Sequence, residues 1–175
     1  MNITIRQELS GDYKVTEKVI RSAFANMEFS DKKEHELVSR LRKSDAFIPK
    51  LSLVAVTKEI VGHILLSKIK ISNDNQFAES LALAPVSVLP EYQNKGIGKL
   101  LITEALREAK ELGYKSVVVL GHPEYYPKFG FKKASLWGIK APFEVPDEAF
   151  MAIDLRGNAL NNVSGLVEYP GVFFE

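Results

Sequence analysis

The chain has 175 residues, of which 46% are hydrophobic and 26% charged, and its formal net charge is +1. This length and composition suit one soluble globular domain with its own core, and the charge gives no support to a nucleic-acid-binding or membrane-binding surface. The absence of cysteine excludes disulfides, thiolate nucleophiles and zinc–thiolate sites. Three widely spaced histidines form no local metal motif, so we expect no metal. We see no signal peptide and no membrane span, and expect a cytoplasmic protein.

The first third of the chain predicts a strand, two helices and a β-hairpin. Alternating apolar and polar residues over 3–8 predict the strand. Apolar residues at helical spacing predict a helix over 15–24, and Ser30-Asp31 then caps a second helix. Two β-prone runs, 51–56 and 60–71, are joined by a short polar link that is typical of a hairpin turn.

The middle of the chain predicts a strand, a long helix and a second strand. Leu81–Leu89 is a β run interrupted by Pro85, which cannot donate to a sheet ladder, so we expect a bulge or an opened edge there. Ile97–Leu112 is the clearest helix, with Gly113 as its C-terminal cap. The apolar run Ser116–Leu120 fits a strand covered on both faces.

The last third of the chain predicts less regular structure. After Phe131 we expect one or two more strands, with Phe150–Leu155 the last regular one. Residues 156–175 carry scattered apolar side chains and are expected to pack on the surface of the same domain. We find no repeat and no internal linker, so the expected unit is one domain over residues 1–155 with this tail packed on it.

The loop that enters the long helix is the most informative segment. The first amides of a helix lack intrahelical partners and point outward, and the helix dipole adds positive potential there. Gly96 and Gly98 have no side chains to keep a phosphate away from the backbone, and Lys95 and Lys99 add positive charge. The sequence therefore predicts an anion-binding site at the start of this helix.

Two common phosphate-binding motifs do not fit this loop. The NTPase phosphate loop needs a hydroxyl residue after its Gly-Lys pair, where this chain has Leu100, and an early glycine that is missing. The dinucleotide fingerprint needs a third glycine, where this chain has Leu101. The following strand also ends without a carboxylate for a ribose, so both readings fail.

Two motifs together resemble the signatures of the GNAT N-acetyltransferase superfamily. One is Gln93-x-x-Gly96-x-Gly98 after a strand, and the other is Tyr126-x-x-x-Gly130-Phe131. The resemblance covers residues 3–155, and it is nearest to the YhbS-like bacterial branch, whose tail tends to carry Gly-x-Val-x-Tyr-Pro, as residues 165–170 do here.

The resemblance implies an α/β (α+β) fold in a single domain. We expect a central mixed, mostly antiparallel sheet of about seven strands flanked by about four helices. The sheet should be splayed between the strands around 81–89 and 116–120. Here the tyrosine motif is preceded by Gly121-His122-Pro123-Glu124 in place of the asparagine that many members carry, and Pro127 should shorten its helix.

The resemblance also implies an acetyl-coenzyme A-dependent N-acetyltransferase. The acetyl group would pass directly from the thioester to a primary amine, on a small molecule, a peptide or a protein. The alternative is a non-catalytic acyl-coenzyme A sensor of the same fold, and a homodimer is possible in either case. The implied coenzyme A-binding residues are Val86, Ser87, Val88, Gln93, Asn94, Lys95, Gly96, Ile97, Gly98, Lys99, His122 and Tyr125.

Catalytic roles follow from the same resemblance. A backbone N–H of Val88, or of its neighbours Ser87 and Leu89, is the expected oxyanion donor. Tyr126 is the candidate acid for the leaving thiolate, with Tyr125 as its competitor. The candidate base is Glu79 acting through water, with His63 as a further option.

Overall fold

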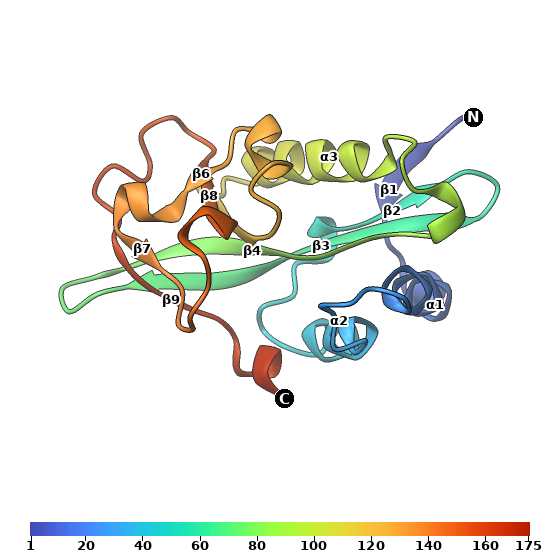
Figure 1. Ribbon diagram of the computed structural model, residues 1–175, viewed down its shortest axis with the longest axis horizontal. Coiled ribbons are helices and arrows are strands. Elements are labelled where there is room, and N and C mark those ends of the chain that lie inside the picture. Colours follow the sequence, from blue (N-terminus) through green and yellow to red (C-terminus); the bar gives the residue numbers. More distant parts are fainter.

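The computed structural model describes all residues, Met1 to Glu175, as one sheet with helices on both faces (Figure 1). The sheet has nine strands, and its main path runs β1-β2-β3-β4-β5-β8-β6. β9 pairs with β3, and β7 pairs with β9. All pairs are antiparallel except β4–β5 and β7–β9. The strands are β1 Thr4–Gln7, β2 Ser52–Val56, β3 Ile60–Ser72, β4 Phe77–Val88, β5 Ser116–Leu120, β6 Lys132–Lys133, β7 Ile139–Lys140, β8 Phe150–Asp154 and β9 Gly165–Glu168.

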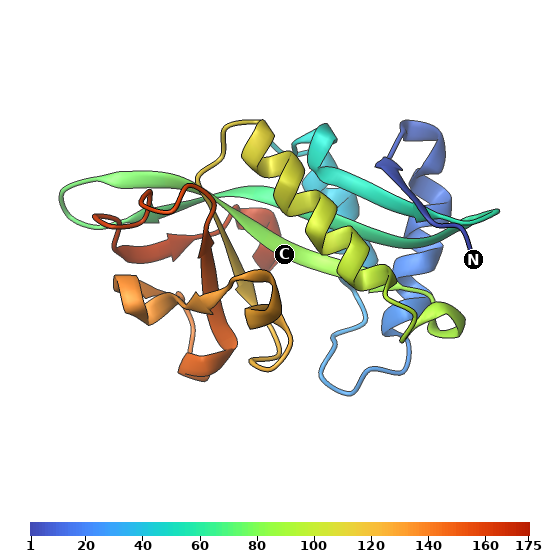
Figure 2. The ribbon, with the colours of Figure 1, turned by 90° about the horizontal axis from the view of Figure 1, so that it is seen from above.

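The helices form a layer on each face of the sheet. α1 (Tyr13–Phe24) and α2 (Glu34–Arg42) lie on one face, and α3 (Ile97–Glu111) lies across the strands of the other (Figures 1 and 2). A 3-10 turn over Tyr126–Phe129 stands where a fourth helix was expected, and Pro127 in its first turn accounts for its shortness. No helix combines the length and the apolar character needed to cross a membrane.

Alternation along β3 explains why both faces carry helices. Ile64 and Leu66 belong to the core cluster under α3, whereas Leu65 belongs to the cluster under α1 and α2. Successive side chains of a strand point to opposite faces, so an uninterrupted apolar run buries both. All three side chains are fully buried, and each contributes about 1.5–3 kcal/mol from leaving water.

β4 and β5 separate soon after they meet. Their pairing consists of Leu81 with Val117 and Ala82 with Val118, after which β4 runs on to Val88 without β5 beside it. On its other edge β4 carries a bulge, because its register with β3 shifts by one residue around Pro85. The prediction of a bulge or an opened edge is therefore confirmed, and β4 has both. We call the gap between β4 residues 83–88 and the end of β5 the splay.

The tail is more regular than the sequence indicated. The prediction that Phe150–Leu155 is the last strand is wrong, because β9 in the tail pairs with residues 70–72 of β3. Leu160 and Val167 are buried in the core cluster that β5 and β8 also line. A four-residue strand with a single buried side chain is too short to stand out in a sequence.

Candidate active site

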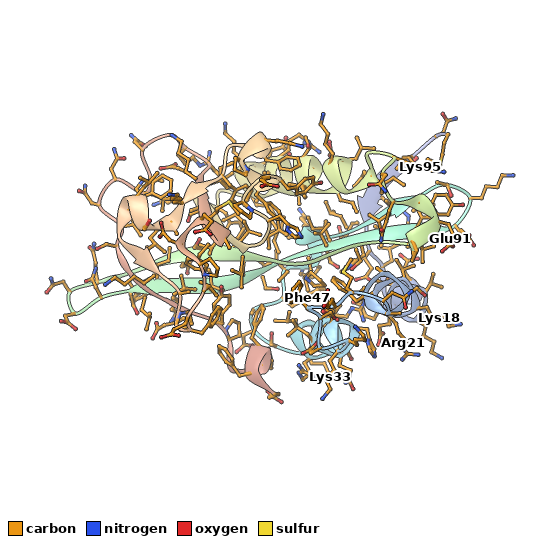
Figure 3. The ribbon with its side chains drawn as sticks, viewed as in Figure 1. Lys18, Arg21, Lys33, Phe47, Glu91 and Lys95 are labelled. Carbon is orange, nitrogen blue, oxygen red and sulfur yellow. The ribbon has the colours of Figure 1, made fainter.

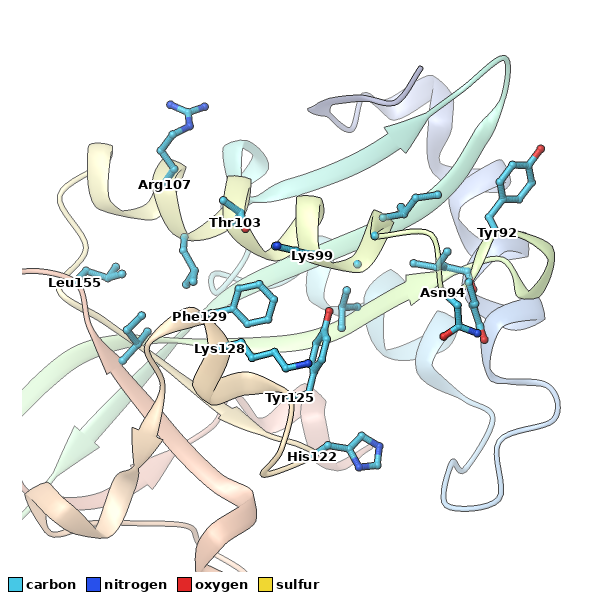
Figure 4. A pocket seen from close by; sticks show the side chains of 18 of the residues that line it. Tyr92, Asn94, Lys99, Thr103, Arg107, His122, Tyr125, Lys128, Phe129 and Leu155 are labelled. Carbon is cyan, nitrogen blue, oxygen red and sulfur yellow. The ribbon is translucent and has the colours of Figure 1, made fainter. Parts of the chain in front are cut away.

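A groove of about 1190 Å³ lies between α3, the end of β4 and the segment after β5 (Figure 4). It is open along one side of α3, and the splay forms part of its wall. Most of the predicted coenzyme A-binding residues line it: Val86, Val88, Gln93, Asn94, Gly96, Ile97, Gly98, Lys99, His122 and Tyr125.

The glycine loop, Gln93–Gly98, presents backbone donors to this groove. Asn94 has φ +63° and Gly96 has φ +83°, so the chain turns through the left-handed region twice before α3 begins. A side chain at Gly96 would be strained in that conformation. The first helical bond runs from the Leu100 N–H to the Gly96 C=O, 3.1 Å, and the amides of residues 94–99 donate to no acceptor in the structure. They form a cluster of unpaired donors at the positive end of the helix dipole.

Val88 turns its backbone toward the splay. The Leu89 N–H donates to the Val61 C=O at 2.8 Å, which makes Val88 and its partner Gly62 a pair without mutual hydrogen bonds. The N–H and C=O of Val88 therefore point away from β3. Gln93 Nε2 donates to this carbonyl at 3.0 Å, tying the glycine loop to the strand. The Val88 N–H is left facing the splay, as an oxyanion donor must.

Two predicted residues do not reach the groove with their side chains. Ser87 is buried on the opposite side of the sheet, where its hydroxyl has no hydrogen-bond partner. Lys95 is exposed at the end of the molecule that carries the glycine loop, with Nζ 5.7 Å from the centre of the Tyr92 ring (Figure 3).

Several basic groove residues lie outside the predicted set. Lys128 faces Lys99 across the groove, with its Nζ 5.8 Å from the centre of the Tyr125 ring (Figure 4). Arg107 and Lys110 continue the row that Lys99 begins along α3. Together with Thr103 these residues recur every three or four positions, which was visible in the sequence as the polar face of this helix. Arg107 also binds carboxylates of its own helix, so part of its charge is neutralised.

The two adjacent tyrosines have different surroundings. Tyr125 lies in the groove with its hydroxyl close to Gly98, since a Cβ added to Gly98 would be 3.3 Å from Oη. Tyr126 is only 7% exposed and packs in the core, its ring centre 5.7 Å from that of Phe131. The Tyr126 ring also requires Gly121, where an added Cβ would lie 2.3 Å from the ring. Burial raises the pKa of Tyr126 to about 12, so its phenol is protonated near neutral pH.

Comparison with known proteins identifies the family. The acetyltransferase (GNAT) domain family matches residues 50–133. The uncharacterized N-acetyltransferase YhbS of Escherichia coli K12 is 33% identical over 149 residues, 84% of this chain and 87% of that protein. A second protein of that strain, the uncharacterized N-acetyltransferase YjhQ, is 35% identical over 78% of each chain. The chain belongs to the GNAT acetyltransferase family.

Solved GNAT structures share the whole fold. The complex of Escherichia coli YhbS with coenzyme A matches with a TM-score of 0.89 and 28% identity, covering 100% of this chain and 93% of that one. A Brucella melitensis GNAT acetyltransferase in complex with acetyl-coenzyme A matches with a TM-score of 0.81 and 32% identity, covering 98% of both chains. The predicted family and fold class are therefore confirmed.

Neither candidate base lies in the groove of this GNAT domain. Glu79 is exposed near the start of β4, pairs with Lys70 across the ladder, and lines a separate cavity with Tyr114. Val88 is nine residues further on, which at about 3.3 Å per residue is roughly 30 Å along the strand. The sequence indicates that Glu79 lies near the start of a strand. The residues of that strand that line the groove, Val86 and Val88, lie near its other end.

His63 is fully buried under α1 and α2, in a polar network. Its Nε2 lies 3.0 Å from Ser52 Oγ, and Ser52 donates to Glu8 at 2.7 Å. Arg42 pairs with the other oxygen of Glu8, also at 2.7 Å. Burial lowers the pKa of His63 to about 4, so the ring is neutral near pH 7. These contacts give His63 a structural role.

Proposed function

We propose that this GNAT protein transfers the acetyl group of acetyl-coenzyme A directly to a primary amine. The observation that carries the proposal is the cluster of unpaired amides over residues 94–99, set in a groove that reaches the splay. Unpaired donors at a helix N-terminus favour a phosphate. The coenzyme A and acetyl-coenzyme A complexes of the two similar structures support the same ligand here.

The donor would occupy the whole groove. Its pyrophosphate would accept hydrogen bonds from the glycine loop, with Lys99 and Lys128 supplying positive charge from the two walls. The pantetheine arm would follow β4 past Val86 and Val88, whose backbone is not covered by β5. Tyr125 would close over the arm from the opposite wall.

The reaction needs no covalent enzyme intermediate. The free amine attacks the thioester carbonyl carbon, forming a C–N bond, and the developing oxyanion accepts a hydrogen bond from the Val88 N–H. The C–S bond then breaks, the thiolate takes the Tyr126 proton, and the nitrogen loses its extra proton to solvent. Solvent restores the proton of Tyr126.

A coupled assay of free thiol tests this function. Acetyl-coenzyme A is offered with polyamines, amino acids, aminoglycosides, arylalkylamines and peptides. We expect release of coenzyme A with at least one class of amine, and sequential kinetics, because both substrates must be bound together. Binding of acetyl-coenzyme A without thiol release from any amine would favour the sensor function instead.

A further inference from the structure

We propose that the acceptor amine carries an uncharged aromatic or branched aliphatic group, which binds in an apolar pocket on the α2 side of the splay. This inference rests on the proposed function and names the class of its acceptor. The pocket has a volume of about 310 Å³, and every residue that lines it is hydrophobic. That volume is at the small end of ligand sites, which suits one compact apolar group.

The apolar pocket opens onto the strands that border the splay. β4 contributes Ala82 and Ala84, and β5 contributes Val118 and Leu120. The last β4–β5 pair is Ala82 with Val118, so the pocket lies where the two strands part. The groove reaches the same part of β4 from the α3 side, through Val86 and Val88. A group in the pocket and a thioester in the groove would thus approach each other across the splay.

The C-terminal segment builds the outer wall of this pocket. Tyr169 stacks on Phe143, with ring centres 6.0 Å apart, and meets Phe174 edge-on at 6.3 Å. Arg40 of α2 donates to the Val172 carbonyl at 3.2 Å and holds the segment beside that helix, as Figure 1 shows. Most apolar residues of the tail pack on the core, but Phe174 is 64% exposed at the rim of the pocket, a position that core packing does not explain.

The lack of charged side chains in the pocket disfavours amines that carry a second charged group. It contains no carboxylate to pair with a second ammonium and no cation to pair with a carboxylate. Its one titratable residue is Tyr169, whose pKa burial raises to about 12. Placing a second charge there would cost its hydration without return, whereas an aromatic or aliphatic group gains by leaving water. Diamines, aminoglycosides and free amino acids are therefore poor candidates.

The place where the pocket opens to solvent indicates that its occupant is the acceptor amine and not a longer acyl chain of the donor. Leu120, Phe143 and Phe174 at its rim are 45%, 40% and 64% exposed, so the pocket opens to solvent on the face opposite α3. An acceptor needs such an entrance, because the donor fills the groove, whereas an acyl chain would arrive through the splay. Apolar surroundings also lower the pKa of an ammonium and favour the free amine, which matters where no base lines the pocket.

The test compares kcat/KM for amines of matched size. We expect 2-phenylethylamine to exceed both 1,5-diaminopentane and phenylalanine by at least about tenfold. Phe174→Ala should lower kcat/KM for 2-phenylethylamine roughly three- to tenfold and leave the KM of acetyl-coenzyme A unchanged. Phe77→Ala is the matched control, an equally exposed phenylalanine (61%) at the far tip of the β3–β4 hairpin, and should change neither.

A second variant adds a charge to the same pocket. Leu120→Glu places a carboxylate at the exposed rim, and we expect the ratio of kcat/KM for 2-phenylethylamine over 1,5-diaminopentane to fall at least about tenfold. Faster acetylation of charged amines by the wild-type protein, or no response of either amine to both variants, would overturn the inference alone. So would variants that alter only the preference for acyl chain length. Failure of acetyl-coenzyme A to bind to the wild-type protein would instead overturn the proposed function on which this inference rests.

Discussion

Tyr125 and Tyr126 show how one residue of displacement changes what a side chain can do. Tyr126 begins the 3-10 turn and Tyr125 is its N-cap, yet Tyr125 lines the groove whereas the ring of Tyr126 packs in the core and leaves only 7% of the residue exposed. The sequence motif singles out Tyr126 by its distance from Gly130 and Phe131. It says nothing about burial, which depends on Phe131, on Gly121 and on the strands they join.

The two tyrosines predict separable kinetic effects. Tyr126→Phe should lower kcat about a hundredfold and leave the Kd of acetyl-coenzyme A unchanged, because it removes only the proton donor. Tyr125→Phe should instead weaken acetyl-coenzyme A binding a few-fold, the size of one hydrogen bond. The packing contacts of both side chains are made by their rings, which phenylalanine keeps, so both variants should keep the wild-type stability. Steady-state kinetics and calorimetry measure the effects, and an unaltered kcat in Tyr126→Phe would remove it from the acid role.

His63 predicts a pH dependence of stability. Its pKa is about 4 in the folded protein and about 6.5 in the unfolded chain, so the unfolded state binds more protons between these values. Stability from this residue is therefore complete above about pH 6.5 and is lost as the pH falls toward 4, by about 3 kcal/mol.

Urea denaturation from pH 7 to pH 4.5 measures this loss. His63→Gln should flatten the decrease in the free energy of unfolding, and His122→Gln, on an exposed loop, is the matched control. An unaltered pH profile in His63→Gln would show that another group is responsible.

Among the elements, β4 lines both the groove and the apolar pocket, and its sequence revealed only part of its course. Pro85 indicated the bulge, because proline cannot join a ladder, and the apolar periodicity of α3 fixed the helix and the glycine loop before it. The start of β4 and the existence of β9 were not predictable, since residues 77–80 and 165–168 carry too few buried apolar side chains to mark a strand. The start of β4 and the strand β9 both depend on pairing with another strand. The periodicity of a single segment carries no information about its partner.

The β9 strand predicts that the tail is part of the folding unit. Gly165 has φ +128°, and a Cβ there would lie 2.1 Å from the Ser72 carbonyl oxygen. Gly165→Ala should therefore destabilise the protein by at least about 2 kcal/mol through steric overlap and backbone strain. Gly171→Ala, where no atom lies within 4 Å of the added Cβ, should change the free energy of unfolding by less than about 0.5 kcal/mol. Equal urea midpoints for the two variants would show that β9 adds nothing to stability.

At the scale of the whole molecule, a groove and an apolar pocket lie on opposite faces of the sheet, and we infer that reactants in them meet at the splay. The α3 face holds a groove with unpaired amides and lysines, suited to an anionic cosubstrate. The α2 face holds an apolar pocket, one wall of which is the C-terminal segment, and it is suited to an uncharged group. Bringing two reactants together from opposite faces supplies catalysis by positioning, which can account for much of the rate of a direct transfer.

The central claim is that the glycine loop binds the phosphates of acetyl-coenzyme A. Gly96 and Gly113 lie at opposite ends of α3, both have positive φ, and neither has an atom within 4 Å of an added Cβ. Glutamate therefore imposes similar backbone strain at both positions, but only at Gly96 does it put a negative charge among the unpaired amides.

Isothermal titration of acetyl-coenzyme A into these two variants tests that claim most directly. We predict that Gly96→Glu weakens binding at least about a hundredfold, roughly 3 kcal/mol, while Gly113→Glu stays within about twofold of the wild-type Kd. Wild-type affinity in a folded Gly96→Glu protein would contradict the claim.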